Sequence, residues 1–531
     1  MRRLHFAVLS VLCGCMGQID GPMSLTDAQA QEVPVTGLRR LSRVELDQSL
    51  RDLFGDQARR AQRLLPPEPT DPFDNDYRQQ LASAALVEAV EALAVELADA
   101  TLADPVRRAS LLPCMPTGPA DVACLRAFTE TFGRRVLRRP LTTEEVDRFM
   151  TLQPLAVEAN DFDFGVKLVI RALVQEPAFL YRVELGVPLA QAGLAQLGAY
   201  ELATRLSYFL VGSTPPDWLL DQAADGTLDS RDGLVAAAQR LLATQDAKAQ
   251  VERFHSLWLG YHRLPHAIDL TTAMQAESGA LVDRVVFEQA GDYFDLFTAT
   301  DSYVNAQLAT HYGLASAPSG TGFQWLPYGS APRKGLLSHG AVLSQGVKFA
   351  DSSPTQRGIF IRTRLLCMDV GAPPPGVNVD EQPVSTSPCK KDRYQAHASV
   401  GGCKSCHQQI DPIGFGLERY DREGKYRMTD DGLPQCPIEG TGTVTGAPAG
   451  DLSFAGPDGL ADALIASGAF ERCIVTQVFR FEQGRRERPD DVAALDARTA
   501  RFKADDRHFQ GLLIDMVTDD TFRFRRDEEV P

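Results

Sequence analysis

The sequence predicts a mainly α-helical protein, with a large multi-helix body followed by a C-terminal lobe that contains short β elements. Apolar residues recur at helical spacing in many segments, as in Leu46, Leu50 and Leu53, which is typical of helices packed on one face. Capping boxes, in which a hydroxyl and a carboxylate satisfy each other's backbone amides, are predicted at Ser42–Glu45 and Thr142–Glu145. A chain of 531 residues with 44% hydrophobic residues can build several packed segments.

The N-terminus has the pattern of a lipoprotein-type signal peptide over residues 1–15. Arg2 and Arg3 precede an apolar stretch that is too short to span a bilayer. The end of this stretch resembles a bacterial lipobox, which predicts lipidation of Cys15, with ordinary secretion as the alternative. Residues 16–36 are expected to form a flexible tether. We therefore expect export to the periplasm or the outer-membrane surface, with membrane contact through the lipid anchor only.

Three helical segments are expected after the tether. Segment 37–113 contains an Ala/Leu/Val-rich stretch from about Gln80 to Ala103, whose composition favours helix. Segment 125–190 follows a Pro/Gly/Asp-rich loop. Segment 191–330 contains several amphipathic helices and ends in a Gly/Ser/Pro-rich region in which we expect short strands.

The C-terminal lobe is expected to consist of two segments. In segment 331–435, an extended proline-rich linker at Ala372–Gly376 leads to the stretch Val400–Asp421. Segment 436–531 is predicted to begin with a short β-hairpin near Gly440–Gly450 and to continue as helices. The stretch Val400–Asp421 carries the strongest chemical signal of the chain.

Cys403-Lys-Ser-Cys406-His407 is a C-x-x-C-H motif. In c-type haem attachment, two thiols at this spacing add to the two vinyl groups of one porphyrin, and the following imidazole binds the iron. The alternatives are a C-x-x-C disulfide beside a histidine and half of a zinc site. A zinc site needs a second ligand pair at similar spacing, and the chain has no other C-x-x-C. The motif therefore predicts covalent haem c on Cys403 and Cys406, with His407 on the iron.

The cysteine count agrees with haem attachment in an oxidising compartment. Ten cysteines are present, two of them at the end of the signal peptide. If haem takes two of the other eight, six are left, an even number that fits three disulfides. Cys114 and Cys124 are expected to pair with each other across their loop. The pairing of the last four stays open: Cys367, Cys389, Cys436 and Cys473.

The second axial ligand of the iron would separate electron transfer from catalysis. Methionine favours a high-potential electron carrier, whereas an open position permits peroxide or oxygen chemistry. Met428 is the nearest downstream candidate. Asp411 or a nearby carbonyl is expected to hold the second ring nitrogen of His407. The alternative second ligands are Met368, His397 and His339.

The residues that follow the motif are expected to surround the haem. Gly414 and Gly416 permit a close backbone approach, either to a flat group or in a plain turn. The expected apolar and aromatic wall consists of Ile410, Ile413, Phe415, Leu417, Tyr420 and Tyr426.

Other function classes have weaker support. The formal net charge of −16 argues against a nucleic-acid partner. No G-x-S-x-G elbow surrounds Ser338-His339, so a serine hydrolase is not favoured. His255, His262 and His266 suggest a metal site, but a proline interrupts the helical spacing of the last two, and a packed helix end is the favoured interpretation.

Motifs spread over most of the chain occur in a fixed order. They are Leu38–Gly55, Arg138–Glu145, Pro177–Arg182, Leu202–Leu210, Ser353–Gly358, Cys403–Gly424 and Phe470–Arg485. In this order they resemble domain-of-unknown-function family 1592 with its companion segments 1587, 1595, 1588 and 1585. The resemblance implies an exported protein with a cytochrome-c-like C-terminal lobe, and it implies no particular substrate.

These observations lead to one favoured hypothesis and one alternative. The favoured hypothesis is an exported c-type haem-binding redox protein, which transfers electrons with a redox partner or acts as an oxidoreductase on an unidentified extracellular substrate. The alternative is a haem-free helical binding or scaffold lipoprotein with a Cys403–Cys406 disulfide. A hydrolase of extracellular polymers lacks a recognisable nucleophile constellation.

Overall fold

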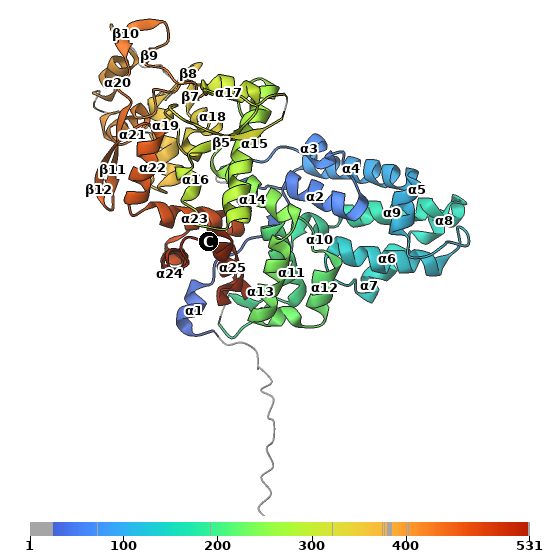
Figure 1. The fold of residues 1–531 in the computed structure, drawn as a ribbon. Coiled ribbons are helices and arrows are strands. Elements are labelled where there is room, and N and C mark those ends of the chain that lie inside the picture. The colour runs from blue at the N-terminus through green and yellow to red at the C-terminus, as the bar shows by residue number, and fades with distance from the viewer. Residues whose placement is uncertain are drawn as a thin grey trace, which may run out of the picture.

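The computed structural model describes residues 25–71, 73–191, 193–320, 322–373, 375, 378–379, 385–399, 401 and 403–528. The predicted mainly α-helical fold is confirmed, because 56% of the described residues are helical and the strands among them are few and short (Figure 1). The expected signal peptide, the lipidation site Cys15 and the first part of the tether lie outside the described residues. Within the described ranges, no helix is both long and apolar enough to cross a bilayer.

The N-terminal helices form a bundle around a core of their own, to the right in Figure 1. Its helices are α2 (Arg43–Phe54), α3 (Arg60–Leu64), α4 (Ala84–Ala103), α5 (Pro105–Leu111), α6 (Val122–Leu137), α7 (Thr143–Met150), α8 (Gln153–Glu158), α9 (Phe162–Gln175) and α10 (Pro177–Leu180). Both predicted capping boxes are present. Ser42 and Glu45 exchange hydrogen bonds at the start of α2, and Thr142 and Glu145 do so at the start of α7.

The remaining helices build the larger part of the molecule. In the middle of the chain they are α11 (Ala199–Leu210), α12 (Asp217–Ala224), α13 (Arg231–Leu242), α14 (Gln245–Trp258), α15 (Ile268–Asp283), α16 (Asp295–Thr298) and α17 (Ala306–Tyr312). Towards the C-terminus they are α18 (Gly340–Leu343), α19 (Pro354–Phe360), α20 (Lys390–Ala398), α21 (Lys404–Phe415), α22 (Gly456–Ala466), α23 (Phe470–Gln483), α24 (Val492–Ala504) and α25 (Phe509–Thr518).

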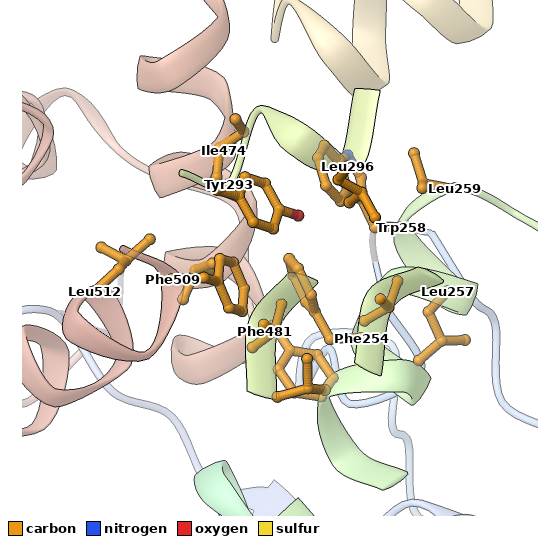
Figure 2. Packing of buried hydrophobic residues seen from close by; sticks show 14 of the residues in the cluster. Phe254, Leu257, Trp258, Leu259, Tyr293, Leu296, Ile474, Phe481, Phe509 and Leu512 are labelled. Atoms are coloured by element: carbon orange, nitrogen blue, oxygen red, sulfur yellow. The ribbon is translucent and has the colours of Figure 1, made fainter. Parts of the chain in front are cut away.

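These helices share one core, which extends into the expected C-terminal lobe. The buried cluster contains Phe73 and residues from Leu197 to Phe522, on both sides of the expected boundary at residue 330. Figure 2 shows the reason. Phe254 of α14, Phe509 of α25 and Tyr293, which precedes α16, converge although they are far apart in the sequence. The rings of Tyr293 and Phe509 stack with centroids 4.6 Å apart. Such aromatic contacts bury large apolar areas and bind the two halves into one body.

The strands pair antiparallel, in two-stranded sheets and one three-stranded sheet with the order β13–β4–β3. The predicted strands before residue 330 and the predicted hairpin after residue 436 are confirmed as the pairs β5–β6 and β11–β12. The strands are β1 (Arg39–Arg40), β2 (Tyr181–Arg182), β3 (Val187–Pro188), β4 (Leu194–Gln196), β5 (Asp301–Val304), β6 (Gln324–Pro327), β7 (Val347–Lys348), β8 (Asp351–Ser352), β9 (Thr429–Asp430), β10 (Leu433–Pro437), β11 (Thr441–Ala447), β12 (Gly450–Ala455) and β13 (Phe524–Arg526).

The prediction of a flexible tether over residues 16–36 is wrong in its described part. Residues Asp27–Glu32 form helix α1, which begins with a capping box at Thr26. Val33, only 2% exposed, belongs to a small apolar cluster with Phe524 of β13. The partner of this segment comes from the opposite end of the chain, so local sequence reasoning could not anticipate it.

The described cysteines form three disulfides, as the cysteine count predicted. The expected bond between Cys114 and Cys124 is confirmed. The pairing that the sequence left open is Cys367–Cys473 and Cys389–Cys436. Both bonds lie in the C-terminal half, and the first joins residues 106 positions apart.

A buried carboxyl group lies on α15, away from the C-x-x-C-H motif. The Glu277 carboxyl accepts hydrogen bonds from Ser302 and, at 2.5 Å, from Tyr312. Burial raises the pKa of Glu277 from 4.5 to about 7, although these two hydrogen bonds and Arg333 act in the opposite direction. The folded protein therefore holds a proton on Glu277 that the unfolded chain loses above about pH 4.5.

Because Glu277 holds this proton in the folded state, we expect the stability of the protein to fall as the pH rises. Because the folded state binds the extra proton, the free energy of unfolding should fall by about 3 kcal/mol between pH 4.5 and pH 7 and show no further loss above it. Glu277→Gln removes this contribution and should flatten the profile in urea unfolding at several pH values. Glu88→Gln, at an exposed position of α4, is the control and should keep the wild-type profile. Parallel profiles for wild type and Glu277→Gln would contradict the prediction.

Candidate functional site

Helix α21 carries the C-x-x-C-H motif in its first turn. Cys403 is the N-cap residue, and Cys406 and His407 follow within the helix. The helix lies directly against α19. A Cβ atom on Gly414 would come within 1.8 Å of the Pro354 carbonyl oxygen, and one on Gly358 within 1.9 Å of the Ile410 carbonyl oxygen. Only glycine permits this backbone contact, which sets the position of the motif relative to α19.

The close approach expected at Gly414 and Gly416 exists, but it serves packing of the protein itself. Gly414 faces the backbone of α19, as described above. Gly416 faces the ring of Phe454 and the Cα atom of Gly442 in the β11–β12 hairpin. Both glycines therefore position α21 between two neighbouring elements, and neither is among the residues that line the cavity with the two thiols.

Cys403 and Cys406 differ from the other described cysteines. Six of the eight described cysteines form disulfides, whereas these two are half-buried free thiols. Both line a cavity of about 210 Å³ together with His407. The further lining includes apolar and aromatic side chains, among them Phe349, Ile359, Val370, Pro373, Tyr394 and Ile410.

The His407 ring is held by a carboxylate, which is one of the two partners expected from the sequence. Its Nδ1 lies 2.9 Å from Oδ2 of Asp411, one helical turn further along α21. Asp411 is 4% exposed, and its other oxygen accepts a hydrogen bond of 2.7 Å from the Thr355 hydroxyl of α19. A histidine whose Nδ1 binds a carboxylate presents Nε2 as the coordinating nitrogen. The role of Thr355 has no signal in the sequence, because it depends on the contact between two helices.

The segment after α21 is held by a buried ion cluster. Arg357 of α19 is 2% exposed and donates to a Glu418 carboxylate oxygen at 2.9 Å. Glu418 also binds Lys390 at 3.0 Å and Arg427 at 3.1 Å. Burial alone would raise the pKa of Glu418, but these three cations together lower it below its usual value. The cluster connects α19, α20 and the chain after α21, and sequence spacing does not reveal it.

The candidate second ligands lie in different places. Met428 is 55% exposed, and its sulfur lies 3.1 Å from the Tyr426 hydroxyl. His339 is fully buried beside Ser278, and Met368 packs against the main core. His397 lines the cavity of Cys403 and Cys406, and none of the other candidates is among its described lining residues.

Of the residues expected to form the haem wall, only some lie at the cavities beside α21. Ile410 lines the cavity with the two thiols. Ile413, Leu417 and Tyr420 belong to the main core instead, and Tyr426 is 38% exposed. Ile413 faces the core because neighbouring positions of α21 face different directions, and Leu417, Tyr420 and Tyr426 lie beyond the end of this helix.

A second and larger cavity lies beside α21. Its volume is about 870 Å³, and it lies between α20, α21 and the strands β9 to β12. Phe415 lines this cavity, as do His407 and Asp411. His407 therefore borders both cavities, and its environment is partly polar on this side.

The other residues considered for chemistry have separate structural partners. The Ser338 hydroxyl donates to the Gly335 carbonyl and lies in a buried turn. The three histidines of the suggested metal site do not converge: His255 binds Val251 and Tyr293, His262 binds Ser256, and His266 binds Ser344. Within the described ranges, no group of three histidine, cysteine or acidic side chains is arranged to hold a metal ion.

Fold and site together define a class: a disulfide-bonded, mainly α-helical protein in which a C-x-x-C-H helix presents two free thiols and an imidazole to one cavity. Five family models match the chain, each described as a protein of unknown function. They are DUF1587 at residues 39–103, DUF1595 at 124–184, DUF1592 at 197–314, DUF1588 at 333–430 and DUF1585 at 451–522.

The chain therefore belongs to the multi-segment family of unknown function that these five models define. The C-x-x-C-H motif and the ion cluster around Glu418 lie within the DUF1588 match. A search of curated proteins and a search of solved structures each found no match.

Proposed function

We propose that this protein is an exported c-type haem-binding redox protein. Cys403 and Cys406 each add across one vinyl group of a single haem: a carbon–sulfur bond forms, and the thiol proton goes to the neighbouring vinyl carbon. His407 binds the iron through Nε2. The observation that carries the proposal is that these two free thiols and this imidazole line one cavity, while the other described cysteines pair.

The residues present fit the attachment of such a group. The Nδ1 atom of His407 is engaged by Asp411, which keeps the ring oriented. The cavity of about 210 Å³ is smaller than typical ligand pockets of roughly 300–1,000 Å³. However, Val379 lines it and is 53% exposed, so the cavity reaches the surface and a macrocycle would extend outward there.

When bound, haem supplies one-electron chemistry that protein side chains lack. The chain's own residues would hold and orient the group: the two cysteines through covalent bonds, His407 through the iron, and Asp411 and Thr355 through the hydrogen-bond chain behind the imidazole. The reaction served is electron transfer with a redox partner or oxidation of an extracellular substrate.

The proposal includes the compartment. The signal-peptide pattern at residues 1–15 and the lipobox cysteine Cys15 support export and a lipid anchor, in the periplasm or at the outer-membrane surface. The three disulfides support an oxidising environment. The net charge of −16 supports a partner other than nucleic acid.

The double variant Cys403→Ala/Cys406→Ala is expected to lose covalent haem completely, because no thiol remains to hold the porphyrin. The full chain should be produced in a bacterial strain that attaches c-type haem. A pyridine haemochrome spectrum and the intact mass then report the attached haem. Cys114→Ala/Cys124→Ala, which removes a distant disulfide, is the matched control and should keep haem.

A wild-type protein with no c-type band and no added porphyrin mass would overturn the proposal. The alternative is a haem-free helical binding or scaffold lipoprotein with a Cys403–Cys406 disulfide. In that case, alkylation of the unreduced protein would label neither cysteine, and reduction would expose both.

A further inference from the structure

A second histidine faces the same cavity as the haem-attachment motif. His397 of α20 lines it together with Cys403, Cys406 and His407. The centroids of the His397 and His407 rings are 4.7 Å apart, and the ring planes are inclined at 80°. The two imidazoles therefore meet directly beside the two thiols.

Helix α20 is anchored so that His397 is held at this cavity. At its start, Cys389 is bonded to Cys436, and the buried Lys390 amine binds Glu418 at 3.0 Å. One turn later, the Tyr394 hydroxyl donates to Ser353 at 3.2 Å. Lys390, Tyr394 and His397 are spaced four and three residues apart and share one helix face. The face that carries the anchors thus also carries the imidazole.

We infer that His397 is the second axial ligand of the iron, so that the haem has two histidine ligands. This inference rests on the proposed haem attachment. The two rings now meet edge to face with their centroids 4.7 Å apart, so coordination requires His397 to move away from His407 and to turn until its nitrogen points at the iron. His397 is the next-to-last residue of α20, and a helix end adjusts at low cost. Met428, by contrast, lies exposed against Tyr426.

This assignment narrows the function. With imidazoles on both sides, the iron has no open position for peroxide or oxygen, so the protein transfers electrons rather than activating these oxidants. A second histidine in place of a methionine also lowers the reduction potential, since methionine ligation raises it. The partner is therefore a one-electron donor or acceptor that docks near the exposed edge of the haem.

The test uses the full-length holoprotein from a strain that attaches c-type haem. Visible absorption and electron paramagnetic resonance spectra of the ferric form report the axial ligands. Wild type should give a low-spin signal of two imidazoles and lack the iron–methionine charge-transfer band. His397→Ala should lose the low-spin signal and regain it when free imidazole is added. His397→Met should raise the reduction potential, and Met428→Ala should match wild type.

Two results would overturn the inference alone: a low-spin signal in His397→Ala without added imidazole, or loss of the wild-type spectrum in Met428→Ala. In both cases the haem is attached, so the proposed function stands. Absence of covalent haem from the wild type overturns both. Rescue by imidazole and the folded His397→Met variant separate ligand loss from misfolding, since a misfolded protein would not recover its spectrum.

Discussion

Gly414→Ala is expected to destabilise the protein by about 2 kcal/mol or more. The added methyl group would lie 1.8 Å from the Pro354 carbonyl oxygen, which belongs to the backbone and cannot turn away. Overpacking a tight site costs roughly 1–3 kcal/mol and sometimes more. The better helix propensity of alanine returns only about 0.5–1 kcal/mol. The cost of forcing α19 and α21 apart therefore outweighs the gain in helix propensity. We expect the variant to unfold at a lower guanidinium concentration than wild type.

Gly459→Ala is the matched control for this substitution. Gly459 also lies inside a helix, α22, but the nearest atom to its added methyl group is 3.5 Å away, an ordinary contact. This variant should be as stable as wild type or more stable by up to about 1 kcal/mol. Equal effects of the two substitutions would show that α19 and α21 are not in backbone contact.

Arg357→Met is expected to cost about 3–5 kcal/mol of unfolding free energy, the range for breaking a buried ion pair from one side. Arg357 binds Glu418 and, in addition, donates to four backbone carbonyls. These carbonyls belong to Leu417, Tyr420, Leu343 and Asp421. Methionine fills most of the space but donates no hydrogen bonds, so the buried Glu418 carboxylate and four backbone carbonyls lose a donor.

The control is Arg126→Met, which removes an exposed ion pair. Arg126 and Asp147 lie 2.8 Å apart, but their side chains are 40% and 59% exposed, so the loss should be about 1 kcal/mol or less. Urea unfolding of both variants gives the comparison. If Arg357→Met were no more destabilising than Arg126→Met, the cluster around Glu418 would not hold the C-x-x-C-H helix in place.

Much of the local structure was predictable because its causes lie within a few residues. The capping boxes at Ser42 and Thr142 and the Cys114–Cys124 disulfide each depend on near neighbours in the sequence. The contact between Asp411 and His407 was predictable for the same reason, since residues four apart share a helix face. The motif and its carboxylate partner therefore needed no tertiary information.

The wrong prediction of a tether and the shared core of the C-terminal lobe both concern segments whose partners are distant in the sequence. The tether expected at residues 16–36 packs against Phe524, and the expected C-terminal lobe shares its core with α14 and α15. Both contacts depend on how the chain returns to itself, which periodicity does not report. The residues expected to form the haem wall are divided for a related reason: Ile410 of α21 lines the cavity with the thiols, whereas Ile413 of the same helix belongs to the main core.

By itself, the sequence determined the helical class, the motif Cys403–His407 and the number of disulfides, and it offered Asp411 or a nearby carbonyl as the partner of the His407 ring. These features follow from spacing along one segment and from the chemistry of the residue types. Only the tertiary structure decided that Thr355 supports Asp411, that Arg357 and Lys390 meet at Glu418, and that His397 rather than Met428 faces the thiols. Each of these contacts joins separate elements, and their approach is set by packing, above all by the glycines between α19 and α21.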